Sequence, residues 1–360
     1  MTKVFITGAS MVPVNRHYDM SLFDLAESAF MGLRKTVEEM PEVDAIIVTN
    51  SFAQKLENQS MLGFKLSKRL GLSGKLSMTV EQGDASGGAG ILAAYSIVKS
   101  GVARNVIVVG LDKFSDFPSK FVNDAVSTTL EDVSYYEGLL PAPYGALIMK
   151  SYMRKYGVKE DYFYNWAIKM HSNALENPYA YLRFPVDPET VRKSQEVSTP
   201  MKLFDIAPRA DGASSVLISS EDFKKVSDSP VEIEAVEFDS GEPTISSLEF
   251  PLRKAQVRGD KTAIEISDSF SVSAAIELES LGLAEKGKSL ESLDSLNVNL
   301  SGGLKARGYP GGATGIYQVA EVYMQLIDQF PGKKARDAEE GLVLNTDDLL
   351  RTSYMIYLRR

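Results

Sequence analysis

The chain has 360 residues, of which 44% are hydrophobic, and its formal net charge is −9 at pH 7. This length is sufficient for one large or two medium domains with sizeable cores. No segment approaches the roughly 18 consecutive apolar residues that a membrane helix needs, and the first residues predict a strand rather than a signal peptide. We therefore expect a globular protein of the cytoplasm without a membrane partner.

Two residue counts exclude whole classes of chemistry. The chain contains no cysteine and only two histidines, His17 and His171. Disulfides, thiolate metal sites and every mechanism that depends on a protein thiolate are therefore excluded, and we expect no metal site. Lysine and arginine are scattered through the sequence without forming a basic stripe, so nucleic acid is not an expected partner.

The N-terminal part of the chain predicts an α/β sheet. Residues 43–49 and 105–110 are short, β-branched apolar runs that suit strands covered on both faces. Between them, the Gly-rich segment 81–90 leads into residues 91–98, which would be apolar or small on nearly every side of a helix. Such a helix is expected in the centre of the protein rather than on its surface.

The middle of the chain differs in composition from the two ends. Residues 150–196 are richer in tyrosine, asparagine and charge, and a helical stretch starts at 162–166 and ends at 177–179. We interpret this region as part of an insertion, at about residues 118–205, that covers the core. A pair of strands is predicted to follow, at residues 214–219 and 231–236.

The C-terminal third repeats the plan of the N-terminal part. A strand-like run at 296–300 precedes a Gly-rich turn at 308–315, a helix-like segment at 316–330 and a strand-like run at 341–345. Two Gly-rich turns, each opening a helix between two strands, indicate a duplicated α/β unit with mostly parallel, mixed sheets. We divide the chain into an N-terminal half, residues 1–220, which includes the insertion, and a C-terminal half, residues 221–360.

Residues 301–315, with the sequence SGGLKARGYPGGATG, resemble the C-terminal signature of thiolases, especially of archaeal and sterol-carrier-protein-linked thiolases. Segments 84–88, 173–178, 211–213 and 265–270 resemble further thiolase segments in the same order. The resemblance covers essentially the whole chain and implies a thiolase fold, a five-layer αβαβα sandwich of two duplicated halves. It also implies a homodimer or tetramer, with coenzyme A or acyl-CoA as the ligand and no required cofactor.

The nucleophile of the family is replaced in this chain. Thiolases place a reactive cysteine at the N-terminus of the buried central helix, and the matching residue is Asp84. A helix N-terminus stabilises a carboxylate by roughly 0.3 to 1 kcal/mol, which lowers its pKa and makes it a poorer nucleophile. The alternative interpretation is that Asp84 serves as the N-cap of the helix.

The other catalytic positions are also changed. The family's His-Asp-Cys-Phe matches residues 267–270, so Ser267 and Ser269 replace the histidine and the second cysteine, while Asp268 is retained. The family's Gly-His-Pro matches residues 308–310, where Tyr309 replaces an imidazole of pKa about 6.5 by a phenol of pKa about 10. The structural alternatives are turn residues for the two serines and a packed core ring for Tyr309.

Residues 345–350 replace the Gly-rich loop that thiolases have after their last strand, and they carry Asp347 and Asp348. Adjacent side chains diverge, which argues against a metal ion shared by this pair. His171 matches a family position outside the catalytic set and is expected to be structural. A site for the phosphates of coenzyme A needs arginine or lysine. The candidate contacts are Arg183, Lys305 and Arg307, with Gly312 of the Gly-rich turn.

These replacements predict a thiolase-like protein, related to acetyl-CoA acetyltransferases, that lacks thiolase activity and serves as an acyl-CoA-binding or complex-forming subunit. The resemblance suggests hydroxymethylglutaryl-CoA synthase and an OB-fold, zinc-ribbon protein as partners. The alternative is a cysteine-independent acyl-CoA acyltransferase, decarboxylase or hydrolase that acts through Asp84, Tyr309 and Asp268. A purely structural subunit, with its pocket closed by Tyr309 and the acidic loop, is the third hypothesis.

Overall fold

A nine-stranded mixed sheet runs through the molecule in the computed structural model, which describes residues 2–255, 257 and 261–360. The strands of the N-terminal half, in sheet order, are β3 (Leu76–Val80), β2 (Ala45–Thr49), β4 (Asn105–Asp112), β7 (Gly212–Ser220) and β1 (Val4–Met11). Those of the C-terminal half are β8 (Val231–Ser240), β11 (Thr352–Arg359), β10 (Glu340–Thr346) and β9 (Thr262–Ile266). A separate small sheet pairs β5 (Glu196–Ser198) with β6 (Met201–Lys202).

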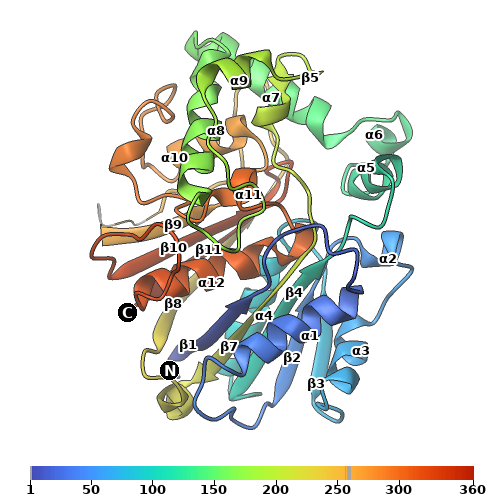
Figure 1. The fold of residues 1–360 in the computed structure, drawn as a ribbon, viewed down its shortest axis with the longest axis vertical. Helices are drawn as coiled ribbons and strands as arrows, with labels where there is room; N and C mark the ends of the chain where they lie inside the picture. Colours follow the sequence, from blue (N-terminus) through green and yellow to red (C-terminus); the bar gives the residue numbers. More distant parts are fainter. Residues whose placement is uncertain (1, 256, 258–260) are drawn as a thin grey trace.

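The helices form layers on both sides of the two sheet halves (Figure 1). The helices of the N-terminal half are α1 (Leu22–Leu33), α2 (Ala53–Leu56), α3 (Leu62–Arg69) and α4 (Ser86–Lys99). Those of the middle region are α5 (Ser119–Ser127), α6 (Asp132–Tyr136), α7 (Pro141–Tyr156), α8 (Asp161–Ala174) and α9 (Pro188–Lys193). Those of the C-terminal half are α10 (Ser271–Ser280), α11 (Gly303–Ala306) and α12 (Thr314–Leu326).

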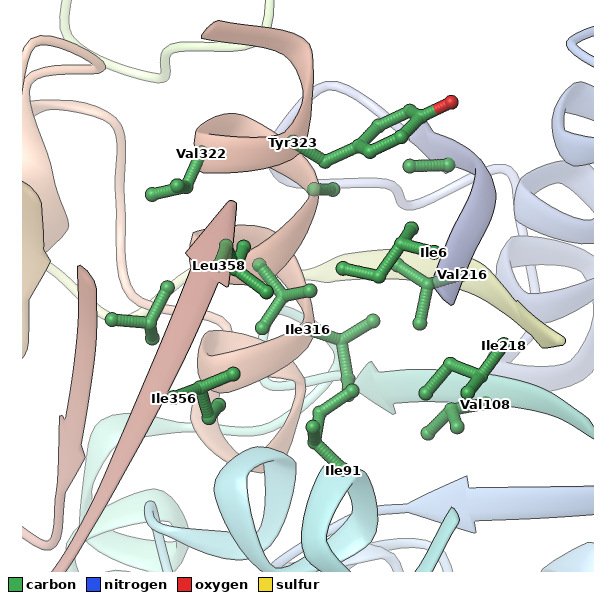
Figure 2. Close-up of a cluster of buried hydrophobic side chains, with 14 of the residues drawn as sticks. Ile6, Ile91, Val108, Val216, Ile218, Ile316, Val322, Tyr323, Ile356 and Leu358 are labelled. Atoms are coloured by element: carbon green, nitrogen blue, oxygen red, sulfur yellow. The ribbon is translucent and has the colours of Figure 1, made fainter. Parts of the chain in front are cut away.

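Three buried apolar clusters separate the five layers. The first packs α1 and α3 against the N-terminal strands. The second surrounds α4 and α12, which lie between the two sheet halves, and it includes Ile91, Ile316, Val108 and Ile356 (Figure 2). The third packs α7, α8 and α10 against the C-terminal strands. This arrangement confirms the predicted α/β thiolase fold, and α4 is the central helix that its small and apolar residues predicted.

The nine-stranded sheet contains both parallel and antiparallel strand pairs. The pair β2–β4 is parallel, as predicted for the strands on either side of the central helix, and the pairs β3–β2 and β9–β10 are parallel as well. The remaining pairs of the nine-stranded sheet are antiparallel, and β1 joins the two halves through the pairs Phe5–Glu232 and Ile6–Val231.

None of the helices in the described part of the chain has the length and apolarity that a bilayer crossing requires.

Two details of the predicted topology are wrong. Residues 296–300 form only an isolated bridge, between Ile264 and Val298, because the Asn299 side chain bonds the main chain of Ile266 where a strand partner would. The segments at 214–219 and 231–236 are both strands, yet they are not neighbours. The N-terminal strand β1 lies between them and pairs with both. Neither outcome follows from local composition, because both depend on segments distant in the sequence.

Glycines allow the two central helices to meet backbone to backbone. A Cβ atom on Gly87 of α4 would lie 2.6 Å from both the Cα and the N of Gly315 in α12. A Cβ atom on Gly315 would lie 2.7 Å from the N of Gly88. No side chain fits in this space, so the contact fixes how the first turns of the two helices are placed. The start of α4, and with it position 84, is thereby held against the C-terminal half.

We expect Gly87→Ala to lower the free energy of unfolding by about 2–3 kcal/mol, because the added methyl group must push the two helices apart. Urea denaturation followed by circular dichroism measures this change. Gly241→Ala is the control, since its Cβ would lie 3.7 Å from the nearest atom, Pro251 Cβ. Equal stability of the two variants would show that the helix contact is not tight.

Candidate active site

Asp84 lies in the turn between β3 and α4. Gly83, with a φ of +54°, makes the left-handed turn that leads from the strand to the helix. The N-cap of α4 is Ala85, and the Gly88 main-chain N in the first turn donates to Asn345 Oδ1 at 2.8 Å, so the interpretation of Asp84 as the N-cap is wrong. The Asp84 side chain is 2% exposed. It points to an arginine instead of to the helix amides.

Arg209, which precedes β7, neutralises the buried carboxylate of Asp84. Its Nη1 and Nη2 atoms each donate to one carboxylate oxygen of Asp84 at 3.0 Å. The same guanidinium bonds Asp348, on the loop between β10 and β11, and lies 4.4 Å from the ring centre of Tyr309. The Tyr309 hydroxyl donates to Asp348. We call Asp84, Arg209, Tyr309 and Asp348 the Arg209 cluster.

Two further rings enclose the guanidinium of Arg209. Its central carbon lies 5.4 Å from the ring centre of Phe52 and 5.6 Å from that of Phe114. Both rings belong to the small apolar cluster through which α5 packs on α2. The Arg209 side chain remains 16% exposed. The insertion therefore supports these two rings through α5 without contacting the guanidinium through them itself, and Arg209 retains some contact with solvent.

Burial and charge set the protonation of the Arg209 cluster. Burial acts to lower the pKa of Arg209, but Asp84 and Asp348 raise it well above its ordinary value, so the guanidinium stays charged. Burial, together with the nearby Asp84 carboxylate, raises the pKa of Asp348 to about 7. Burial and Asp348 raise the pKa of Tyr309 well above 10. The cluster thus combines a permanent cation, a neutral phenol and a carboxyl group that titrates near neutrality.

The two serines predicted as site residues have different surroundings. Ser269 Oγ donates to the Tyr309 hydroxyl oxygen at 3.3 Å, so Ser269 adjoins the Arg209 cluster. Ser267 Oγ accepts from the side chain of Asn345 and from the main-chain N of Thr346, both at 3.2 Å. Asn345 also donates to the main-chain oxygen of Asp84 at 3.3 Å. Within the described residues, Asn345 thus links Ser267 to the main chain of Asp84.

Asp268 faces away from the Arg209 cluster. Its carboxylate accepts hydrogen bonds from Trp166 Nε1 at 2.8 Å, Asn299 Nδ2 at 2.9 Å, and the main-chain N atoms of Leu304 at 2.7 Å and Lys305 at 3.2 Å. Burial raises the pKa of Asp268 to about 6, although these donors oppose the change. These hydrogen bonds hold the start of α11 and the Gly-rich turn in place, so the contacts of Asp268 are structural.

The candidate contacts for coenzyme A do not converge. The amine of Lys305 is buried and donates to the main-chain oxygen of Ile206 at 2.6 Å, and burial lowers its pKa to about 8. Arg307 is fully buried, with its Nε atom 3.0 Å from Glu321 Oε1. Arg183 is exposed, on the loop before α9. Lys305 and Arg307 therefore support the inside of the Gly-rich turn rather than a surface that a phosphate could reach.

The fourth candidate, Gly312, also makes an internal contact. Its main-chain N donates to Asp112 at 2.8 Å, and Asp112 accepts further bonds from Asn50 Nδ2 at 2.9 Å and from Ser51 N at 3.0 Å. Burial raises the pKa of Asp112 to about 7 despite these donors. Asp112 thus ties the end of β4 to the loop after β2 and to the Gly-rich turn.

Both histidines contact main-chain oxygens. His171 is fully buried in α8, with its Nδ1 atom 3.0 Å from the oxygen of Phe184, and burial lowers its pKa to about 4. His17 Nε2 lies 2.8 Å from the oxygen of Pro13. Neither ring occurs in the described contacts of the Arg209 cluster, so neither replaces the histidine base of the family.

A pocket of about 990 Å³ adjoins the Arg209 cluster. Its walls include Gly83 and Asp347, the chain neighbours of Asp84 and Asp348, and Phe52, whose ring contacts Arg209. Asp347 turns away from Asp348 and pairs with Arg351 at 3.0 Å. No residue of the Arg209 cluster lines this pocket. Within the described residues, the pocket therefore ends beside position 84 without reaching it.

Sequence reasoning missed Arg209 and the role of Asp348. Arg209 stands two residues before the Asp211–Gly212–Ala213 segment, so it lies within a recognised motif region, and a buried carboxylate at position 84 requires a cation. This requirement predicts an arginine or lysine beside Asp84, although it does not select Arg209 among the candidates. The sequence places Asp348 in the acidic loop that replaces the Gly-rich loop and does not indicate its partners, which are Arg209 and Tyr309.

We expect Arg209→Met to lower the free energy of unfolding by about 3–5 kcal/mol, because it leaves the Asp84 carboxylate buried without a partner. Adding Asp84→Asn to this variant should restore much of the loss. A double-mutant cycle by urea denaturation measures the coupling. The control is Arg192→Met, which breaks an exposed bidentate pair with Glu189 and should change stability little. Additive effects of the Asp84 and Arg209 substitutions would contradict this account.

The amino-acid sequence of this chain is similar to those of thiolase domains and of two named proteins. The thiolase N-terminal domain model matches residues 4–199, and the thiolase C-terminal domain-like model matches residues 247–360. The acetyl-CoA acetyltransferase of Methanothermobacter thermautotrophicus is 29% identical, with 96% of each chain covered. Sterol carrier protein 2 of Gallus gallus is 29% identical over 71% of this chain and 54% of its own length.

Solved structures show the same fold. Human mitochondrial 3-ketoacyl-CoA thiolase in complex with CoA superposes with a TM-score of 0.77 at 17% identity, covering 100% of this chain and 98% of its own. The Ltp2-ChsH2(DUF35) aldolase superposes with a TM-score of 0.77 at 19% identity, covering 99% and 97%. With both domain models matched along its length, the chain belongs to the thiolase family.

Proposed function

We propose that this protein binds acyl-CoA thioesters without forming a thioester on its own chain, and that it serves as an acyl-CoA-binding or complex-forming subunit. The observation that supports this proposal is the bidentate ion pair between Asp84 and Arg209 at the place of the family's nucleophile. A carboxylate held by two charge-assisted hydrogen bonds is a weak nucleophile. An acyl-aspartate would also be a high-energy anhydride, which disfavours covalent catalysis at this position.

Ligand binding is supported by the fold and by the pocket. The thiolase-family structure in complex with CoA shares the fold of this chain. The pocket beside the Arg209 cluster is lined largely by hydroxyl and amide side chains, and its charged residues are Lys55 and Arg351 with the carboxylates of Glu81, Glu242 and Asp347. The hydroxyl and amide groups can hydrogen-bond a pantetheine arm, whereas phosphates would compete for Lys55 with Asp124 and for Arg351 with Asp347. We therefore place the proposed coenzyme A site in this pocket, with the acyl group directed toward position 84.

A second candidate is a cysteine-independent enzyme that acts on acyl-CoA. The contact between Tyr309 and Asp348 favours it, because a phenol and a carboxyl group that titrates near neutrality can transfer protons without a thiolate. One structure with the same fold, the Ltp2-ChsH2(DUF35) aldolase, is named for aldol chemistry rather than for thiolysis. Carbon–carbon cleavage of the aldol type needs a proton shuttle but no acyl-enzyme, so it joins decarboxylation and hydrolysis as a reaction that this chain could perform.

We expect the wild-type protein to bind coenzyme A and acetyl-CoA in titration calorimetry and to leave acetoacetyl-CoA uncleaved in the presence of coenzyme A. Intact-mass spectrometry should detect no acetyl group on the chain. Asp84→Cys is the informative variant, because a thiol at this position should become acetylated if the acyl group reaches it. Thiolysis by the wild-type protein at a rate similar to that of the variant would refute the proposal.

We propose that the chain assembles through the edge strand β3. Thiolases are commonly oligomeric, and β3 ends the sheet with its outer main-chain groups facing away from β2. Exposed apolar side chains lie beside this edge, including Phe64 at 56% and Leu76 at 42% exposure. A second copy can extend the sheet and cover these side chains. Heterologous partners, a hydroxymethylglutaryl-CoA synthase or an OB-fold, zinc-ribbon protein, and a cytoplasmic location remain predictions.

We expect the purified protein to be a dimer or tetramer by light scattering coupled to size exclusion. The double variant Phe64→Glu/Leu76→Glu should shift it to monomer, because two carboxylates would have to be buried in the interface. Phe121→Glu, on α5 and 51% exposed, is a control away from the strand edge. A wild-type monomer, or a variant that keeps the wild-type mass, would exclude this interface.

A further inference from the structure

Met61, which precedes α3, combines two features that each disfavour a methionine. Its backbone is left-handed, with φ +55° and ψ +40°, and its side chain is 65% exposed. A left-handed backbone is unfavourable for residues with a Cβ, and only asparagine and aspartate among them tolerate it well. An exposed methionine also keeps a large apolar surface in water. Glycine or asparagine would avoid both disadvantages, so neither the backbone nor the solvent accounts for a methionine at this position.

The other non-glycine residues with a positive φ in the described part of the chain have local reasons for it. Four of them are of the types that tolerate this conformation, namely Asn58, Asn299, Asp328 and Asp337. Leu350 is buried in the apolar cluster around α10, and Leu248 packs against the same cluster. Met61 is of neither type and belongs to none of the apolar clusters formed by the described residues.

The chain on either side of Met61 holds this conformation in place. Before it, Gln59 Oε1 accepts a hydrogen bond from Lys65 Nζ at 2.7 Å, which ties the loop to α3. After it, α3 lies directly on β3, because a Cβ atom on Gly63 would lie only 2.4 Å from the main-chain oxygen of Met78. The turn at Met61 is therefore fixed from both ends. Backbone strain that the surrounding structure maintains in this way is found at ligand-binding sites.

Met61 lines the pocket beside the Arg209 cluster. The other large apolar lining residues, Phe52 and Leu62, are 1% and 2% exposed, so Met61 is the one exposed apolar side chain among the described lining residues. Its exposure places it on the solvent side of the pocket. Phe52 and Gly83 belong to the side that adjoins the Arg209 cluster. A ligand whose acyl end lies near position 84 would therefore extend its other end toward Met61.

We propose that Met61 is a ligand-contact residue that packs on the adenine ring of bound coenzyme A. The inference rests on the proposed binding of acyl-CoA in this pocket. Adenine is the aromatic part of coenzyme A and lies at the opposite end of the molecule from the thioester, and a thioether contacts aromatic rings favourably. The contact adds affinity that the nearby cations supply poorly, since Lys55 and Arg351 are paired with carboxylates. The fixed turn at Met61 also limits the entropy lost on binding.

Titration calorimetry with coenzyme A and with 4′-phosphopantetheine tests the proposal, because 4′-phosphopantetheine lacks the adenine ring. We expect Met61→Gly to weaken the binding of coenzyme A by about 5- to 10-fold, through loss of the contact between the thioether and the ring. The same variant should bind 4′-phosphopantetheine as the wild type does. Met61→Leu, which keeps an apolar side chain of similar volume, should retain most of the affinity for coenzyme A.

Two controls separate this role from a structural one. Glycine accommodates the left-handed backbone, so Met61→Gly should unfold at a urea concentration no lower than that of the wild type. Asn58→Gly is the matched control, because Asn58 is exposed in the same loop, has a φ of +53° and is not among the described lining residues of the pocket. This variant should bind coenzyme A with wild-type affinity.

The outcomes distinguish this inference from the function on which it rests. Equal affinity of the wild type and Met61→Gly for coenzyme A, or an equal loss of affinity for 4′-phosphopantetheine, would overturn the adenine contact and leave the proposed binding intact. A lower mass of Met61→Gly in light scattering would also overturn it, since Met61 would then belong to an interface between copies. A wild-type protein that binds neither ligand would refute the proposed function and this inference with it.

Discussion

The ion pair between Asp84 and Arg209 is the interaction on which the centre of this protein depends. A carboxylate that is 2% exposed costs several kcal/mol unless a cation and hydrogen bonds compensate it, and Arg209 supplies both through two bonds of 3.0 Å. The same guanidinium also bonds Asp348 and stacks on Tyr309. One side chain thus connects segments that belong to both halves of the chain.

The fold explains why this charge pair lies where the family has a thiolate. Close glycine contacts between α4 and α12 fix the first turn of α4 against the C-terminal half. This contact holds Asp84 at the start of α4, where its side chain bonds Arg209. Arg209 supplies the counter-charge that a buried carboxylate at this position needs, so the scaffold tolerates an aspartate there. The position of Asp84 does not by itself make it a nucleophile, because nucleophilicity depends on how tightly the carboxylate is bound by its partners.

The surroundings of the Arg209 cluster couple the insertion to the core. Phe52 and Phe114 contact the guanidinium and also take part in the packing of α5 on α2. The pocket beside the cluster is lined by Phe52 and by Thr128 and Thr129, which directly follow α5. The packing of α5 therefore supports both a ring that contacts Arg209 and one wall of the pocket.

The sequence by itself determined the central helix and the loss of every thiol, because these follow from local periodicity, glycine placement and composition, and it indicated the thiolase fold through the resemblance of its motifs to those of thiolases. It also indicated Asp84, Ser269 and Tyr309 as members of one site through the order of the family motifs. The tertiary structure alone decided that Arg209 and Asp348 complete that site, that Asp268 and Arg307 face elsewhere, and that β1 separates β7 from β8. Those outcomes depend on which distant segments meet, and neither spacing nor composition encodes the partner of a buried charge.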